Sequence, residues 1–398
     1  MSSIQSTIHD ALLNHRSQLE NLAGKIHANP ELGLEEVRAC GWHVELLRAW
    51  GFSVETPFAG LPTAYKAVAG DGVPTFCFMA EYDALRGLGH GCGHNLIGAA
   101  AVGAGKALVE TLHRDSIPGT VVVMGTPSEE GHGGKVKMLA HDALAGIDAV
   151  MLAHPRSRTM PDTGSSAIAR FRVSFEGHSA HAAAAPEEGQ NALDAVMLTF
   201  QGVNAWRQHL PEACRVHGII EEGGQTPNTI PDHTSATIYL RAMEDGILEG
   251  MVQRLHAIAE GAALMTETRS CVEKWGEGYR PRLPNAPLNE AWMEASARAG
   301  LDPGPPAKPN RASSDFGDVS QLVPGAHVYF GISQEHIPVH SRDFCEAAGS
   351  QFGMDQMLRA AEALAVSGYR YIADAAFRER VDDDFREAIG RATPVGSS

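Results

Sequence analysis

Residues capable of metal chemistry follow a short apolar segment, residues 75–80. Glu81 and Asp83 come directly after it, and Cys92 and His94 follow with a single glycine between them. In extended backbone, side chains two residues apart point to the same side, and a thiolate beside an imidazole suits a divalent transition metal. Alone, the pair is also compatible with a buried cysteine and a histidine in a turn. The neighbouring carboxylates favour a pair of metal ligands.

Two further apolar segments, residues 120–125 and 149–153, are also followed by reactive side chains. The adjacent acids Glu129 and Glu130 come after the first, and His154 comes after the second. Neighbouring acids point in different directions, so one can hold a metal while the other acts as a general base near a bound water. A solvated loop, or acids at a helix N-terminus, would also explain the acidic pair. Reactive groups after three such segments favour a functional site.

The three apolar segments have the pattern of strands in a parallel sheet. None of them alternates polar with apolar residues, which is typical of strands buried on both faces. Residues 95–112, rich in alanine and glycine, suit a crossover helix, so the sequence predicts an α/β domain with its site outside the carboxyl ends of the strands. The other elements expected in this domain are helical residues 5–50 with a break at Asn29-Pro30, helix 288–299, strand 327–332 and helix 354–376.

The pattern changes near residue 165, where alternating segments begin. Strands are expected at 167–175, 215–220, 235–241 and 267–275, and helices at 191–209 and 247–265. The order β-α-β-β-α-β is that of a ferredoxin-like α+β unit. We therefore predict a discontinuous catalytic domain, residues 1–165 and 278–398, interrupted by a lid domain, residues 166–277. The charged tail from Asp382 is expected to be frayed.

Composition limits the class of protein. The 398 residues carry 32 basic and 48 acidic side chains, a formal net charge of −16, which argues against nucleic acid or an anionic membrane as a partner. The N-terminus lacks the pattern of a signal peptide, and no apolar run reaches the ~20 residues of a membrane span. Six cysteines without framework spacing indicate reduced thiols, so a cytoplasmic location is expected.

At this point the chain resembles the aminoacylase and glutamate-carboxypeptidase family of metallopeptidases. The nearest branch is that of amidohydrolases acting on N-acyl amino acids, aminobenzoyl-glutamate and related conjugates. The resemblance extends over most of the chain. It is carried by IHANPELGLEE (26–36), AEYDAL (80–85), GHGCGHNLIGAA (89–100), GTPSEEGHGGK (125–135), HP (154–155), GHSAHAAAAPEEGQNALDAV (177–196), GGQTPNTIPD (223–232), SSDFGDVS (313–320) and PVHSRDF (338–344).

The resemblance implies a binuclear metal site and a role for each residue in it. Glu129 is expected to be the general base, Glu130 to bridge the two ions, and Asp83 to orient a ligand imidazole. Manganese or zinc is implied, with cobalt possible in vitro. The implied metal ligands are Cys92, His94, Glu130, His154 and His340.

The lid domain is expected to contribute three further residues and to form a homodimer. In dimeric relatives a histidine at the position of His181 reaches the partner's site and polarises the scissile carbonyl. Asn228 matches a residue near the substrate oxygens, and Arg241 could hold a carboxylate. A turn and a cross-strand charge are the ordinary alternatives for Asn228 and Arg241.

The expected reaction is hydrolysis of the amide bond of N-acyl or N-aroyl amino acid conjugates. The chain departs from many members of the branch at two positions, with Glu81 in place of aspartate and Arg86 in place of proline. The EYDAL form with Glu81 resembles the aminobenzoyl-glutamate and β-alanyl-dipeptide hydrolases, whereas Arg86 could place a cation beside the site or be an ordinary loop residue. Alternatives are a dipeptidase acting on free-amine dipeptides and a hydrolytic deaminase of an aminoaromatic acid. A non-catalytic binding protein of the same fold would be expected to have lost a ligand or the base, whereas all five candidate ligands and Glu129 are present here. A structural zinc site is disfavoured as well, because such sites are usually closed by four Cys or His ligands and have no spare carboxylates.

Overall fold

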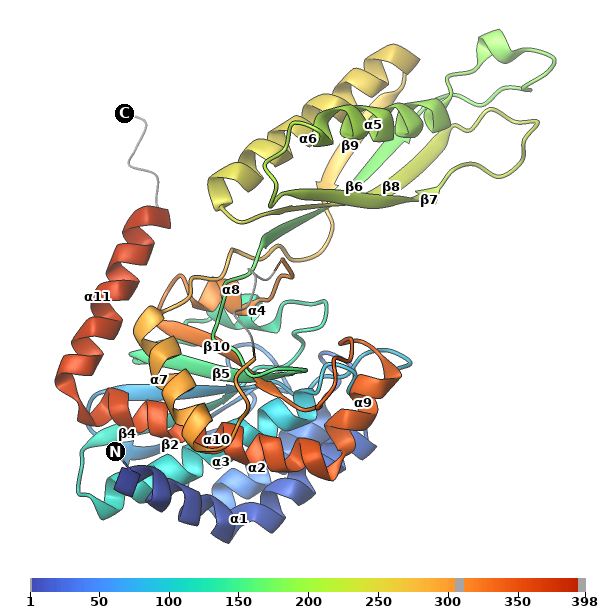
Figure 1. Ribbon diagram of the computed structural model, residues 1–398. Helices are drawn as coiled ribbons and strands as arrows, with labels where there is room; N and C mark the ends of the chain where they lie inside the picture. Colours follow the sequence, from blue (N-terminus) through green and yellow to red (C-terminus); the bar gives the residue numbers. More distant parts are fainter. Residues whose placement is uncertain (1, 305–310, 393–398) are drawn as a thin grey trace. The chain divides into compact units, whose positions relative to one another are not determined.

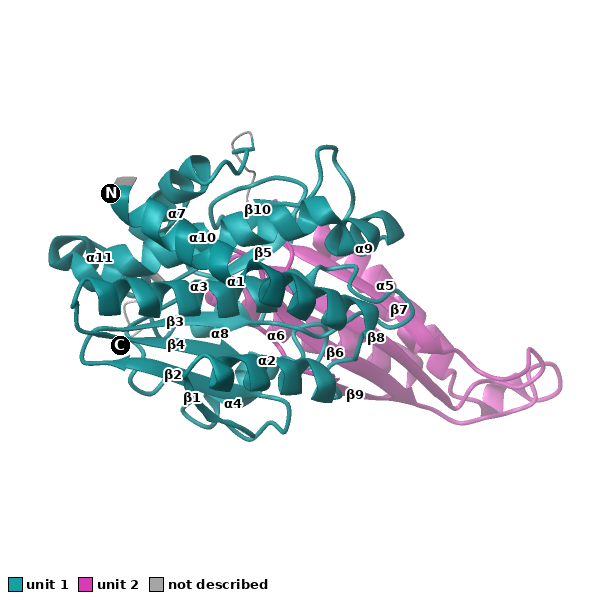
Figure 2. Ribbon diagram, turned by 90° about the horizontal axis from the view of Figure 1, so that it is seen from below, with its two compact units in different colours: residues 1–164, 282–310, 315–395 teal, residues 165–281, 311–314, 396–398 magenta. Residues whose placement is uncertain are grey.

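In a computed structural model, which describes residues 2–304 and 311–392, the chain forms two compact units. Among the described residues, unit 1 comprises 2–164, 282–304 and 315–392, and unit 2 comprises 165–281 and 311–314 (Figure 2). The first unit is therefore discontinuous in sequence. None of the described helices is long and apolar enough to cross a lipid bilayer.

Unit 1 is built on a six-stranded, mainly parallel sheet with the order β1-β2-β4-β3-β5-β10. Strands β3, β4, β5 and β10 run parallel to one another, whereas β2 is antiparallel to both β1 and β4. This arrangement confirms the predicted α/β class. The strands are β1 (Ser53–Glu55), β2 (Tyr65–Asp71), β3 (Thr75–Ala80), β4 (Gly119–Gly125), β5 (Ala149–Arg156) and β10 (Gly325–Gly331).

Helices cover both faces of this sheet (Figure 1). Along β3, Phe76 and Phe78 enter the core beneath the long helices, and Cys77 and Met79 enter a second core on the opposite face with the short helices α4 and α8. Burial on both faces explains the uninterrupted apolar runs. The helices of unit 1 are α1 (Ser2–Ala28), α2 (Val37–Ala49), α3 (His94–Arg114), α4 (Gly134–Leu139), α7 (Ala286–Arg298), α8 (Phe316–Val319), α9 (Arg342–Gly349), α10 (Gln351–Ala373) and α11 (Ala375–Ala392).

Helix α3 lies close to the sheet because small residues line its buried side. A Cβ atom added at Gly105 would lie only 2.4 Å from Cγ2 of Val123 in β4. The helix begins directly at His94, so its close packing also fixes the place of that histidine at the sheet edge.

Unit 2 has the predicted ferredoxin-like order. Its four strands form an antiparallel sheet with the order β7-β8-β6-β9, and the two helices share one apolar core with the sheet. Along β6, buried residues alternate with more exposed ones from Phe171 to Phe175, which explains the period-two pattern of that segment. The elements are β6 (Ala167–Glu176), the short 3-10 helix η1 (Pro186–Glu188), α5 (Ala192–Arg207), β7 (Arg215–Glu222), β8 (His233–Ala242), α6 (Asp245–Thr266) and β9 (Arg269–Lys274).

One expectation about the C-terminus was wrong. Residues 382–392 are not frayed but belong to helix α11. The helix is held by the buried side chains of Phe377 and Val381 and by Asn285, whose side-chain amide donates to the Val381 carbonyl at 2.9 Å. The final residues of the tail, 393–398, lie outside the described part.

Candidate metal centre

The ends of three adjacent strands bring the predicted residues together in unit 1. Strand β3 lies between β4 and β5 in the sheet. Asp83 follows β3, Glu129 and Glu130 follow β4, and His154 lies near the end of β5. Parallel strands end at one edge, so side chains distant in sequence meet there.

Cys92, His94 and His154 form a buried group. Their potential ligand atoms all lie within 4.8 Å of one another, and Sγ of Cys92 lies 3.4 Å from Nε2 of His154. Gly93, between the first two, has φ +77°, and a Cβ atom there would lie 2.8 Å from Cγ of Pro155. Glycine at this position therefore lets the turn place a thiol and an imidazole together.

His340, far downstream in sequence, completes a second group with Cys92 and Glu130. Its Nε2 atom lies 3.1 Å from Oε1 of Glu130, and its backbone amide donates to the carbonyl of Gly91 at 2.9 Å. The residue has φ +61°, in the left-handed region. An unfavourable backbone conformation held by a hydrogen bond is typical of a functional position.

Glu129 and Glu130 form a third group with His94. Burial raises the pKa of Glu129 well above its ordinary value, and the charges of Glu130 and Glu81 raise it further. A bound cation would act in the opposite direction. No described residue donates a hydrogen bond to the Glu129 carboxylate, so the group is available to accept a proton.

The carboxylate of Asp83 contacts two residues of the candidate centre, His94 and Glu130. Its Oδ1 atom lies 2.9 Å from Nδ1 of His94, and its Oδ2 atom accepts a hydrogen bond from the backbone amide of Glu130 at 2.9 Å. Within the described part of the chain, the buried Nε2 atom of His94 has no hydrogen-bond partner. An imidazole that is fixed at one nitrogen and makes no hydrogen bond at the other is what a metal ligand requires. The donor set of thiolate, imidazole and carboxylate fits a divalent transition metal.

The sequence patterns indicated no role for two charged residues next to this centre, Lys135 and Asp315. Lys135, at the start of α4, is fully buried and bonds Glu81 and Asp315. Lys135 and Asp315 both lie in segments that carry the family resemblance, which is the signal that could have found them. A lysine is normally expected at the surface, so its type alone pointed away from this place.

The three residues predicted for the lid domain lie in unit 2. His181 and Asn228 are exposed and lie in adjacent segments, because the amide of Ala182 donates to the Asn228 carbonyl at 3.0 Å. Arg241 lies at the far end of β8, where it donates to Oγ of Ser313 at 2.8 Å. Unit 2 therefore brings the first two residues together and keeps Arg241 apart from them.

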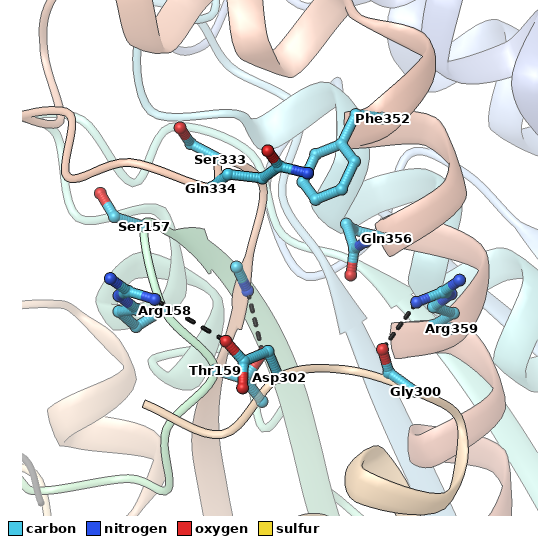
Figure 3. A pocket seen from close by; sticks show the side chains of 11 residues that line it. Ser157, Arg158, Thr159, Gly300, Asp302, Ser333, Gln334, Phe352, Gln356 and Arg359 are labelled. Carbon is cyan, nitrogen blue, oxygen red and sulfur yellow. Dashed lines mark hydrogen bonds and ion pairs between the residues drawn. The ribbon is translucent and has the colours of Figure 1, made fainter. Parts of the chain in front are cut away.

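Unit 1 also contains a polar pocket of about 280 Å³ beyond the ends of β5 and β10 (Figure 3). A guanidinium nitrogen of Arg158 lies 3.7 Å from Oδ2 of Asp302, and the guanidinium of Arg359 donates a hydrogen bond to the carbonyl of Gly300 at 2.6 Å. The lining contains neither a predicted ligand nor Glu129. The residues of the candidate metal centre therefore do not line this pocket.

Comparison with known proteins supports the same chemistry. The Xaa-Arg dipeptidase of Mus musculus is 36% identical over 397 residues, which cover 93% of this chain and 89% of that protein. One of the subunits of the p-aminobenzoyl-glutamate hydrolase of Escherichia coli K12 is 34% identical over 320 residues, covering 75% of this chain and 66% of that protein. These relatives are named for hydrolysis of amide bonds.

Solved structures show the same fold. A putative aminohydrolase from methicillin-resistant Staphylococcus aureus has a TM-score of 0.78 at 21% identity, covering 92% of this chain and 100% of that chain. A dinuclear metal binding M20 peptidase from Bacillus subtilis has a TM-score of 0.66 at 19% identity, covering 89% of this chain and 99% of that chain. Residues 71–365 match the model of peptidase family M20/M25/M40. The chain therefore belongs to this family of metallopeptidases and is a hydrolase of amide bonds.

Proposed function

We propose that this enzyme hydrolyses the amide bond of small carboxylate-bearing substrates, N-acyl or N-aroyl amino acid conjugates. The observation that supports this most directly is the meeting of five potential ligands and one free carboxylate, Glu129, at one sheet edge. Such a site has both the donors for metal and a base beside them. The proposed ligands are Cys92, His94, Glu130, His154 and His340.

Two ions are proposed because the donors form overlapping groups. One group consists of Cys92, His94 and His154, and another joins Cys92 to Glu130 and His340. Manganese or zinc is proposed as the native metal, and cobalt as a substitute in vitro. When bound, the metals would lower the pKa of a water molecule and polarise the substrate carbonyl.

Transfer of the proton from the attacking water to the departing amine is assigned to a residue of the chain. Glu129 accepts a proton from the attacking water and later donates it to the departing amine. Asp83 holds the His94 ring in one orientation throughout. We assign stabilisation of the developing oxyanion to His181. Asn228 and Arg241 are proposed to bind the oxygens and the carboxylate of the substrate.

A second candidate is hydrolysis of free-amine dipeptides. The observation that favours it is the match to the mouse Xaa-Arg dipeptidase, which covers more of this chain, 93%, than the match to the aminobenzoyl-glutamate hydrolase, 75%. Both substrate classes have an amide next to an amino acid carboxylate. They differ in the charge at the acyl side and in the side chain of the released amino acid.

We also propose a homodimer formed through unit 2. Strand β7 is an edge of its sheet, and it exposes Ile219 and Ile220. An exposed apolar edge strand offers unpaired backbone groups for pairing with another strand. A reducing, cytoplasmic location is proposed because each of the six cysteines is free.

A substrate panel tests the proposal. Apo protein is reloaded separately with manganese, zinc or cobalt and assayed on N-acyl amino acids, aminobenzoyl-glutamate, aryl amides and dipeptides ending in arginine or glutamate. Metal-dependent release of an amino acid from the conjugates is expected. Activity confined to free-amine dipeptides would establish the second candidate instead. Release of ammonia from an aminoaromatic acid, with every amide left intact, would contradict both.

A further inference from the structure

A buried ion cluster, Glu81, Lys135 and Asp315, lies beside the candidate metal centre and takes no part in the proposed chemistry. Nζ of Lys135 donates to Oε1 of Glu81 and to Oδ1 of Asp315, both at 2.6 Å. The backbone amide of Lys135 donates to the other oxygen of Asp315 at 2.9 Å. All three side chains are at most 1% exposed.

The charges of the ion cluster do not balance. Two carboxylates surround one ammonium group, so one negative charge is left in excess if all three are ionised. Removing charges from water costs several kcal/mol per ion, and a buried charge is normally paired or coordinates a metal. A further positive charge beside Glu81 would balance this excess, either a protonated His94 imidazole, which lies within ion-pair distance of Glu81, or a metal ion.

The free oxygen of Glu81 shows where that cation would be. Asp315 uses both of its oxygens on Lys135, whereas Oε2 of Glu81 is buried and has no hydrogen-bond partner among the described residues. It lies 3.6 Å from Nε2 of His94, which is also buried without a hydrogen bond. Two donor atoms at about 2.0–2.2 Å from one ion lie within about 4.2 Å of each other, so this separation allows both to hold the same metal.

We propose that Glu81 supplies a carboxylate oxygen to the ion held by His94, and that Lys135 and Asp315 are positioning residues that aim this oxygen. The inference rests on the proposed metal centre. Lys135 fixes one oxygen of Glu81, which leaves the other pointing toward His94. Glu81 is not a member of the three groups whose ligand atoms are mutually within 4.8 Å. Its free oxygen contacts His94, so we expect the effect on the ion that His94 holds.

The test is metal binding rather than turnover. Apo protein and the variants Glu81→Gln and Lys135→Met are titrated with Mn²⁺ and Zn²⁺ by calorimetry, and melting temperatures are recorded in parallel. Glutamine keeps an oxygen for Lys135 but removes the charge, so the affinity of one site should fall about 10–100-fold while the other site stays unchanged. Lys135→Met should weaken the same site.

A matched control separates metal effects from the loss of a buried carboxylate. Glu362 is 4% exposed and accepts a hydrogen bond from Gln5 at 2.7 Å, with no predicted site residue in contact. Glu362→Gln should leave both metal affinities unchanged. If Lys135→Met fails to fold, Lys135→Arg and Glu81→Asp, which keep the charge and alter its position, should weaken the same single site.

The outcomes distinguish this inference from the proposed function. Two ions bound by the parent enzyme, and the same two affinities in folded Glu81→Gln, would overturn the role of Glu81 and leave the metal centre intact. Equal weakening of both sites would overturn the assignment to the ion of His94. A parent enzyme that binds neither Mn²⁺ nor Zn²⁺ would instead refute the metal centre itself.

Discussion

Oδ1 of Asp83 lies 2.9 Å from Nδ1 of His94, and Oδ2 of the same carboxylate accepts a hydrogen bond from the backbone amide of Glu130. One buried side chain therefore fixes the imidazole of one proposed ligand and the backbone of another. The contact leaves Nε2 of His94 facing the centre. The arrangement of these two proposed ligands thus depends on Asp83, which does not itself have to bind metal.

Replacing Asp83 with asparagine should weaken metal binding by about 10–100-fold, because the amide cannot hold the imidazole by charge. Competition with a chelator, followed by metal analysis, measures the change. Asp302→Asn is a suitable control, since that side chain is 83% exposed. Unchanged affinity in a folded Asp83→Asn protein would show that the contact does not support the metal.

Glu129→Gln should bind two metals and lose most of its turnover. A general base contributes about 10²–10⁴-fold to a rate, and glutamine keeps the shape of the side chain without its basic oxygen. Turnover on the best panel substrate is measured beside metal content. Glu130→Gln provides the contrast, since loss of a ligand should lower metal content as well. Substantial activity in Glu129→Gln would remove its assignment as base.

Sequence patterns predict the parts of the fold that are buried on both faces. Residues 75–80 have the pattern of a strand and form one. A short, uninterrupted apolar run is typical of a central strand that is buried on both faces. Strand β2 was missed, since its burial falls off toward Asp71 and its neighbour β1 has only three residues. Helix α11 beyond residue 376 was not predicted, because two buried residues, Phe377 and Val381, are a weak signal within a charged segment.

The candidate site was predictable to a similar degree. Cys92, His94, Glu129 and Glu130 follow strands, so local spacing was enough to select them. His340 came only from the resemblance, because nothing in its neighbourhood indicates which of 19 histidines would return to the sheet edge. The segments of the family resemblance include Lys135 and Asp315, but these residues are 180 positions apart, and the tertiary structure was needed to show that they form a pair.

Glu36 should make stability depend on pH. It is fully buried, and burial, with the nearby charge of Asp83, raises its pKa from 4.5 to about 7. The folded state then binds a proton that the unfolded state releases, so the stabilisation is complete below about pH 4.5 and is lost as pH rises to about 7. The change is on the order of 3 kcal/mol at about 1.4 kcal/mol per pKa unit.

Glu36→Gln should therefore flatten the pH dependence of unfolding between pH 4.5 and 7. Denaturant unfolding of both proteins at several pH values measures the difference. The hydroxyl of Thr63 donates to Oε2 of Glu36 at 2.9 Å, and glutamine keeps an oxygen for this bond. Parallel curves for the two proteins would show that Glu36 titrates normally in the folded state.

The dimer proposal predicts that two inactive variants restore each other. If His181 serves the site of the other subunit, a dimer of Glu129→Gln with His181→Ala has one complete site. Random exchange makes half of the dimers mixed, so the mixture should reach about one quarter of the parent activity. Ile219→Lys, which places a charge on the exposed edge of β7, should lower both the apparent mass by light scattering and this recovery. A mixture no more active than its components, while the mass confirms exchanged dimers, would place His181 in its own subunit's site or outside catalysis.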